Sequence, residues 1–170
     1  MESNSELKYI FSNINELLKF AEAKNGGLMV LNTALVIGIL SSYIGIQNFI
    51  FKPIILIGII FFGISVFLII VSQFPITHNI FYNKNEFENP NLYFFEHLSH
   101  FDVETFITEF KKADNSFNPS KFDIDLINQI LVNARITNTK FDFFKFASYF
   151  TAFGSGLIGL SSIIKIIWHF

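Results

Sequence analysis

Two histidines one helical turn apart are the residues of this sequence best suited to metal chemistry. His97 and His100 lie three positions apart and are flanked by Glu96 and Asp102, and this spacing would place two imidazoles on one face of a helix. A zinc site needs further ligands, whereas the chain contains no cysteine and its other histidines lie far away along the sequence. We therefore expect surface histidines here and no bound metal.

The residue patterns of common catalytic sites are missing from the sequence. There is no GxSxG nucleophile motif and no glycine-rich phosphate loop, and the apolar segments contain no cluster of carboxylates. A formal net charge of -2 also argues against nucleic acid as a polymeric partner, because such proteins need a strongly basic face. We expect no enzymatic activity, no catalytic residue and no cofactor.

Arg135 is the only arginine of the chain and is a candidate for anion binding. A guanidinium group can bind a phosphate through two parallel hydrogen bonds. It can as easily pair with a carboxylate such as Asp102 or Glu104, and a surface ion pair is the commoner arrangement. Both interpretations remain open from the sequence.

Three long uncharged segments dominate the composition of the chain. Hydrophobic residues make up 51% of the sequence, 24 residues are phenylalanine, and the mean hydropathy is +0.46. A helix needs about 20 apolar residues to cross the hydrocarbon layer, and we assign membrane spans to residues 27–47, 54–74 and 146–168. A soluble chain of this length could not cover two helices that are apolar all round. The sequence therefore predicts an all-α integral membrane protein with three transmembrane helices.

Amphipathic helices are expected outside the spans. Residues 5–24 place apolar side chains at alternating three- and four-residue steps, which is typical of a helix with one apolar stripe. A second helix is expected over residues 91–112, followed by a break at residues 113–119. Asp123 caps or opens the next helix, and no helix breaker separates that helix from the third span. We expect residues 91–145 to form cytoplasmic helices, the last of them continuous with the third span.

Basic residues near the ends of the spans predict how the chain crosses the membrane. The side richer in lysine and arginine is normally the cytoplasmic one. The two sides carry unequal sets of lysines: Lys19, Lys24, Lys84, Lys140 and Lys145 against Lys52 and Lys165. We expect a cytoplasmic N-terminus, a cytoplasmic middle segment and an external C-terminus.

Polar and small residues within the spans indicate how the helices pack. Asn32 is an amide in the first span, where an unsatisfied polar group costs free energy, so it should hydrogen-bond a neighbouring helix or line a wet path. The third span has two pairs of small residues four positions apart, which let helix backbones approach closely in lipid. The pairs are Ala152 with Gly156 and Ser155 with Gly159. We expect them to make helix contacts, either within one chain or between the chains of an oligomer.

The order of these features resembles the transmembrane effector family of bacterial Pycsar anti-phage systems. In that family the helix-to-span junction has an Asp-x-Lys-Ala-like motif and then an apolar run containing Asn or Asp. A Tyr-Phe segment follows, and a later helix has a Gln-x-x-x-Asn-x-x-Ile-x-x-x-Lys-Phe-like pattern. The matching residues are Glu22, Lys24 and Asn32, then Tyr93 and Phe94, and then Gln129, Asn133, Ile136, Lys140 and Phe141. The resemblance covers nearly the whole chain, although Glu22 stands where the family usually has Asp.

The resemblance implies an effector of antiviral defence that senses a cyclic pyrimidine nucleotide, such as cCMP or cUMP, made by a partner nucleotide cyclase. Activation would make the chain oligomerise or rearrange and disrupt the bacterial inner membrane, so that infected cells die before the phage spreads. The chain has no separate cyclic-nucleotide-binding domain, so we expect the ligand on the helices of a single domain, residues 1–170. Charge and resemblance make six residues candidates for ligand binding: Glu22, Lys24, Asn32, Gln129, Arg135 and Lys140.

A second hypothesis belongs to another functional class. The chain would then be a non-enzymatic membrane adaptor or scaffold subunit that binds a partner protein through its cytoplasmic helices. A small transporter or channel subunit would call for charged or broken spans at mid-bilayer, and these spans have neither. A nucleotide cyclase encoded by the neighbouring gene would favour the effector over the adaptor.

Overall fold

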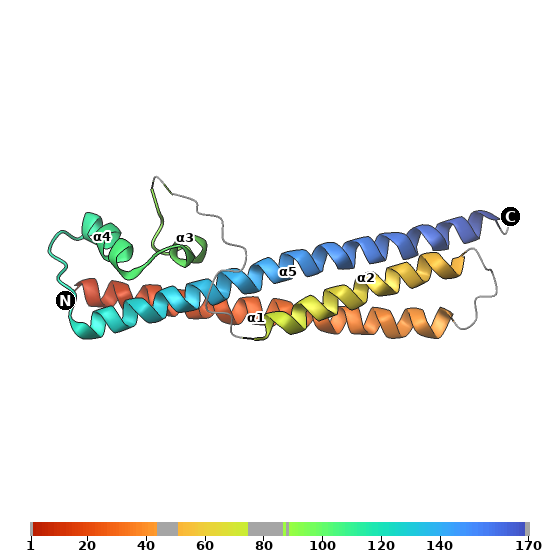
Figure 1. Cartoon of the computed structure of the whole chain (residues 1–170), viewed down its shortest axis with the longest axis horizontal. Helices are drawn as coiled ribbons and strands as arrows, with labels where there is room; N and C mark the ends of the chain where they lie inside the picture. Colours follow the sequence, from red (N-terminus) through yellow and green to blue (C-terminus); the bar gives the residue numbers. More distant parts are fainter. Residues whose placement is uncertain (1, 44–50, 75–86, 88, 169–170) are drawn as a thin grey trace. The chain divides into compact units, whose positions relative to one another are not determined.

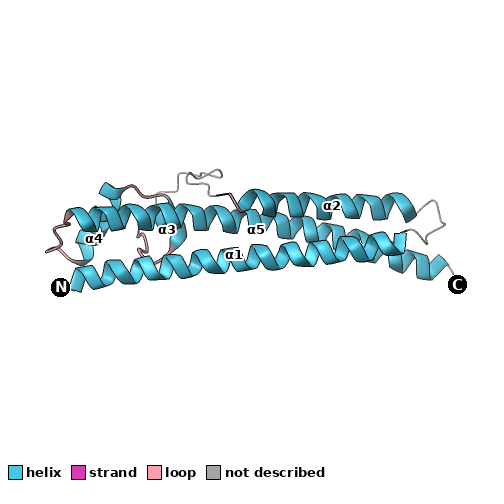
Figure 2. Cartoon of the chain, turned by 90° about the horizontal axis from the view of Figure 1, so that it is seen from below, coloured by secondary structure: helices cyan, strands magenta, loops and turns pink. Residues whose placement is uncertain are grey.

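The computed structural model describes residues 2–43, 51–74, 87 and 89–168 of the chain (Figure 1). Within these residues the protein is built from helices and contains no strand, which confirms the all-α class. The helices are α1 (Glu2–Tyr43), α2 (Phe51–Ser72), α3 (Phe95–Ser99), α4 (Val103–Ala113) and α5 (Lys121–Trp168). Three of them, α1, α2 and α5, are long and apolar enough to cross a membrane. Figure 2 shows that the remaining described residues are loops.

The helices form two compact units. The first, which we call the bundle unit, comprises Met1–Glu22 and Pro75–Asp142. The second, the span unit, comprises Ala23–Phe74 and Phe143–Phe170. Helices α1 and α5 contribute residues to both units, whereas α2 belongs to the span unit and α3 and α4 belong to the bundle unit.

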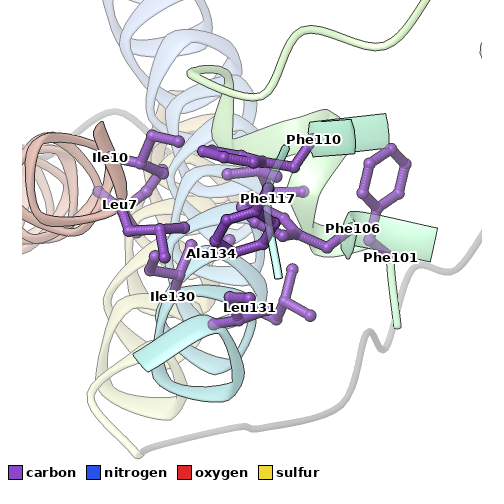
Figure 3. Close-up of a cluster of buried hydrophobic side chains, with 12 residues drawn as sticks. Leu7, Ile10, Phe101, Phe106, Phe110, Phe117, Ile130, Leu131 and Ala134 are labelled. Atoms are coloured by element: carbon purple, nitrogen blue, oxygen red, sulfur yellow. The ribbon is translucent and has the colours of Figure 1, made fainter. Parts of the chain in front are cut away.

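The bundle unit is held together by a core of aliphatic and aromatic side chains. Leu7, Ile10 and Ile14 of α1 are fully buried, and their spacing is that of one helix face. The rings of Phe106 and Phe110 on α4 stack with their centroids 5.9 Å apart and lie among apolar side chains of α1 and α5 (Figure 3). The core consists of Leu7, Ile10, Ile14, Leu98, Phe101, Phe106, Phe110, Phe117, Ile127, Ile130, Leu131 and Ala134. Full burial of one such side chain stabilises the fold by about 1.5–3 kcal/mol.

The prediction of a single helix over residues 91–112 is wrong, because the helix is interrupted at Asp102. Asp102 has an extended backbone conformation, and its carboxylate accepts a hydrogen bond from the Thr105 amide at 2.8 Å. This N-cap satisfies one of the amide groups at the start of α4 that have no partner inside the helix. Helices α3 and α4 are consequently separate. Helix α4 ends at Ala113, where the break predicted for residues 113–119 begins.

Helix α5 begins with a reciprocal interaction between Ser120 and Asp123. The Asp123 carboxylate accepts a hydrogen bond from the Ser120 amide at 2.9 Å, and the Ser120 hydroxyl oxygen accepts one from the Asp123 amide at 3.3 Å. Such a capping box satisfies two amide groups at the start of a helix. Asp123 therefore caps the helix from its third position. From Lys121 the helix runs unbroken to Trp168, which confirms its predicted continuity with the third span.

Residues 5–24 and the first span belong to one helix. Helix α1 continues through Gly26 and Gly27 without a break, and neither glycine has a positive φ. Glycine disfavours a helix interior by about 1 kcal/mol relative to alanine, but an existing helix on both sides propagates through it at little further cost. The last residues of the span predicted at 27–47 lie outside the described residues.

In the span unit, α2 and α5 approach each other at a pair of glycines. A Cβ atom added to Gly154 would lie 3.0 Å from the carbonyl oxygen of Gly58. One added to Gly58 would lie 2.8 Å from Cγ1 of Ile158. A larger residue at either position would therefore have to displace its neighbour on the other helix. Close backbone approach is characteristic of helix pairs in lipid, where apolar surface alone does not drive helices together.

We predict that Gly154→Ala destabilises the span unit by about 1–3 kcal/mol, because its new methyl group overlaps α2. Gly63→Ala is the matched control, since a Cβ atom there meets nothing within 4 Å and both changes raise helix propensity equally. Thermal unfolding of the purified protein in detergent, followed by circular dichroism, measures both effects. Equal melting temperatures for the two variants would contradict the packing of α2 against α5.

Candidate functional site

A cavity of about 930 Å³ lies in the bundle unit between the start of α1, the segment before α3 and the end of α4. This volume falls within the range of pockets that hold small ligands, about 300–1,000 Å³. Its apolar wall includes Ile10 and Phe110, which also belong to the core. Its polar groups come from Glu6, Asn91, Tyr93, Asp114 and Ser116. The cavity is thus built on the core but presents a polar surface.

Tyr93 attaches the segment before α3 to helix α1. Its hydroxyl donates a hydrogen bond to Oε2 of Glu6 at 2.9 Å, and its carbonyl oxygen accepts one from the Asn13 side chain at 2.9 Å. The rings of Tyr9 and Tyr93 meet edge to face with their centroids 5.8 Å apart. The hydrogen bond to Glu6 raises the pKa of Tyr93, and burial and the Glu6 charge add to the shift. Tyr93 is therefore a neutral donor at physiological pH.

The charged groups described at the cavity are both carboxylates. Glu6 carries one of them, and the other belongs to Asp114, whose Oδ1 accepts hydrogen bonds from the Ser116 amide at 3.0 Å and the Ser116 hydroxyl at 2.6 Å. No lysine or arginine is among the described lining residues. The cavity therefore favours a hydrogen-bond donor or a cation over an anion.

The six residues predicted to bind a ligand are distinct from the cavity lining, and two of them, Glu22 and Lys140, contact each other. None of them is among the described residues that line the cavity. Lys140 is only 4% exposed, and its Nζ lies 3.4 Å from Oε1 of Glu22. A buried ammonium group needs such a partner, since an unpaired charge there would be strongly unfavourable. Lys24 is exposed, and its Nζ lies 5.0 Å from the centroid of the Phe144 ring in the span unit, a cation–π contact.

Arg135 binds backbone carbonyl groups at the end of α3. Its Nη2 donates to the carbonyl oxygen of Phe101 at 2.7 Å, and its Nε donates to that of Ser99 at 3.4 Å. No ion pair joins it to Asp102 or Glu104 in the described structure, so the pairing that the sequence left open is not formed, and the guanidinium caps α3. The hydrogen bond from the Thr105 amide lowers the pKa of Asp102, and the nearby Arg135 charge contributes in the same direction.

Gln129 and Asn133, two further candidates from the family-like pattern on α5, differ in their surroundings. Gln129 is exposed. Asn133 donates a hydrogen bond to Oδ1 of Asn15 at 2.7 Å, which joins α5 to α1 in the bundle unit. The motif therefore combines an accessible amide with one that is part of the helix packing.

Asn32 belongs to a buried ring of polar groups that joins the three helices of the span unit. Its Nδ2 donates to the hydroxyl of Ser65 on α2 at 2.8 Å, and its Oδ1 accepts from the hydroxyl of Thr151 on α5 at 2.9 Å. The two hydroxyl oxygens lie 3.0 Å apart, and both also lie within 3.0 Å of the carbonyl oxygen of Ala147. The interhelical hydrogen bond expected for Asn32 is therefore present, and Asn32, Ser65 and Thr151 are all buried.

The small-residue pairs of the third span lie on an open face of α5. Ala152, Ser155, Gly156 and Gly159 are exposed, and a Cβ atom added to either of these glycines meets nothing within 4 Å. The close contact with α2 is made by Gly154 instead. Contacts within one chain therefore do not use this face in the described structure.

The two histidines that suggest a metal site are engaged in local contacts. The Asn91 amide donates to Nδ1 of His97 at 2.9 Å, and the His97 ring stacks on Phe87 with the centroids 3.9 Å apart. Burial lowers the pKa of His100. The described residues contain no group of three or more side chains that could hold a metal ion.

Sequence reasoning missed Glu6 and the hydroxyl partners of Asn32. Tyr93 carried a signal, since it belongs to the Tyr-Phe segment, but Glu6 has the same appearance as any surface glutamate of an amphipathic helix. Ser65 and Thr151 are ordinary residues in membrane helices, so nothing in their type distinguishes them. Only their common depth in three packed helices makes them partners.

Comparison with protein families decides what kind of protein carries this site. A family model described as the Pycsar effector protein domain matches residues 6–166. The chain belongs to this family. No curated protein and no solved structure gives a significant match.

As a Pycsar effector the chain acts in antiphage defence, and its three long apolar helices make it a membrane protein. The family match includes both the cavity and the polar ring, because it extends over parts of all five helices. The residues that carry the resemblance have two kinds of surroundings in this effector. Asn32 and Lys140 are buried and bonded, whereas Tyr93 reaches the cavity.

We predict that Thr151→Val lowers the stability of this Pycsar effector by about 1 kcal/mol, because Oδ1 of buried Asn32 loses its hydroxyl donor. Thr33→Val is the matched control. Thr33 is exposed next to Asn32 on α1, and its hydroxyl bonds only the Met29 carbonyl oxygen of its own helix. Thermal unfolding in detergent measures the melting temperature of each variant. An equal decrease for both changes would contradict a structural role for the ring.

Proposed function

We propose that the chain is a membrane effector that senses a cyclic pyrimidine nucleotide, cCMP or cUMP, and then disrupts the bacterial inner membrane. A partner nucleotide cyclase makes the ligand after phage infection. The bundle unit is the sensing part and faces the cytoplasm, as does the N-terminus, while the C-terminus is external. The span unit is the part that acts on the lipid bilayer, and no catalytic step is involved.

The observation that carries this proposal is the continuity of α5. One helix supplies Ile130 and Ala134 to the core of the bundle unit and Thr151 and Gly154 to the packing of the span unit. A ligand that favours one arrangement of the bundle helices shifts the population of that arrangement. Because α5 has no break at which such a change could be absorbed, the change reaches the spans.

The effector acts as a homo-oligomer in this proposal. The face of α5 formed by Ala152, Ser155, Gly156 and Gly159 supports it, since the face is exposed and is suited to close helix approach in lipid. Several copies that pack through this face bring their third spans together. Rearrangement of such an assembly disturbs a larger area of membrane than a single chain does.

We predict that cells expressing the chain lose their membrane potential when the pyrimidine cyclic nucleotide is produced. A potential-sensitive dye follows the loss after induction of a cyclase, because disrupted membranes cannot hold a gradient. The controls are an inactive cyclase and a cyclase that makes a purine cyclic nucleotide. Depolarisation that is independent of the nucleotide would contradict sensing. An unchanged potential together with a stable co-purifying protein would favour the adaptor.

We also predict that the small-residue face mediates oligomerisation. Gly156→Leu should reduce chemical crosslinking of the chain in membranes at least about fivefold, because a bulky side chain prevents close helix approach. Leu160→Ile is the control, since Leu160 is an exposed, large residue of the same helix. Unchanged crosslinking of Gly156→Leu would contradict this interface.

A further inference from the structure

The chemistry of the cavity in the bundle unit narrows the ligand that it can take. The described charged groups at the cavity are the carboxylates of Glu6 and Asp114, and the phenol of Tyr93 already donates to Glu6. A carboxylate accepts several hydrogen bonds, about four for the two oxygens together. Glu6 is exposed, so its remaining acceptor positions are accessible. The cavity is therefore a site for a group that donates hydrogen bonds.

The same carboxylates disfavour a phosphate group in the interior of the cavity. Like charges at close range are unfavourable, and more so where water is partly excluded. Two of the cations among the sequence candidates have partners outside the cavity: Lys140 pairs with Glu22, and Arg135 binds the carbonyl groups of Ser99 and Phe101. A nucleotide in this cavity must be recognised by its base, with its phosphate directed outward.

We propose that this cavity binds the base of a cytosine nucleotide, with the exocyclic amine of the base donating to the Glu6 carboxylate. The inference rests on the proposed function and decides between its two ligands. Tyr93 is a positioning residue that holds the carboxylate in place through its 2.9 Å hydrogen bond. A volume of about 930 Å³ leaves room for the base and the ribose.

Discrimination between the two bases follows from their opposite hydrogen-bonding groups, a donor in cytosine and an acceptor in uracil. Cytosine presents an amine donor at the position where uracil presents a carbonyl acceptor. A uracil carbonyl facing Glu6 would place two acceptors together, and the ring N–H of uracil lies at a different position from the amine of cytosine. A site built to accept a hydrogen bond rejects a ligand that lacks the donor. Glu6 therefore selects the cytosine nucleotide.

The test is calorimetric titration of the full chain in lipid nanodiscs with cCMP, cUMP and cytidine. We expect wild-type protein to bind cCMP at least about tenfold more tightly than cUMP. Cytidine should compete with cCMP, since the phosphate contributes little. Glu6→Gln should weaken cCMP binding at least about tenfold and bring the cCMP-to-cUMP ratio close to one, because a glutamine amide can donate to uracil or accept from cytosine.

Two further variants separate recognition from a loss of folding. Glu16→Gln is the matched control, because Glu16 is exposed on the same helix and is not among the described lining residues. It should bind like wild type. Tyr93→Phe keeps the ring but removes the donor to Glu6. It should weaken cCMP binding and reduce the preference for cCMP over cUMP. Circular dichroism checks that each variant keeps its helix content.

The outcomes distinguish this inference from the proposed function. If wild-type protein binds neither cyclic pyrimidine nucleotide, both are overturned. If it binds them but prefers cUMP, or if Glu6→Gln retains the wild-type affinity and base preference, the cytosine site is overturned and nucleotide sensing stands. Loss of binding in the Glu16→Gln control would also overturn the assignment to this cavity.

Discussion

The unbroken backbone of α5 is the constraint on which both units of this protein depend. In the bundle unit its apolar face fills the core between α1 and α4, and its side chains reach α1 through Asn133 and the end of α3 through Arg135. In the span unit it contacts α2 at Gly154 and α1 at Thr151. A helix satisfies its own backbone hydrogen bonds, so it can be continuous between an aqueous and a lipid environment. A break in α5 would therefore remove one of the two helices, α1 and α5, that are continuous through both units.

The buried polar groups of Asn32 and Lys140, one in each unit, are paired in different ways. In the span unit neutral groups bond one another, because hydroxyl and amide groups can close a ring without any charge. In the bundle unit charges are present, and that of buried Lys140 is paired with Glu22. Arg135 is occupied by carbonyl groups. Neither cation lines the described cavity, whose charged side chains are those of Glu6 and Asp114.

Family membership and geometry answer different questions about this chain. The match to the Pycsar effector protein domain identifies a defence effector, whereas a fold by itself does not define a function. The geometry shows which side chains are accessible to a ligand and which are already bonded within the packed helices. Tyr93 illustrates the difference, since the resemblance marks it only as part of a short motif. Its hydrogen bond to Glu6 places it at a cavity whose described charged side chains are carboxylates.

The sequence by itself determined the helical class, the three spans and the continuity of α5, because hydrophobic period and length are local properties of the chain. It also determined that Asn32 needs a partner, since a polar group in lipid must be satisfied. Only the tertiary structure decided that the partners are Ser65 and Thr151. It likewise decided that Arg135 caps α3, that Asp102 separates α3 from α4, and that Glu6 meets Tyr93 at a cavity. The residue types in these pairs do not indicate which residues will be partners. The pairs form only because the folded helices bring the side chains together.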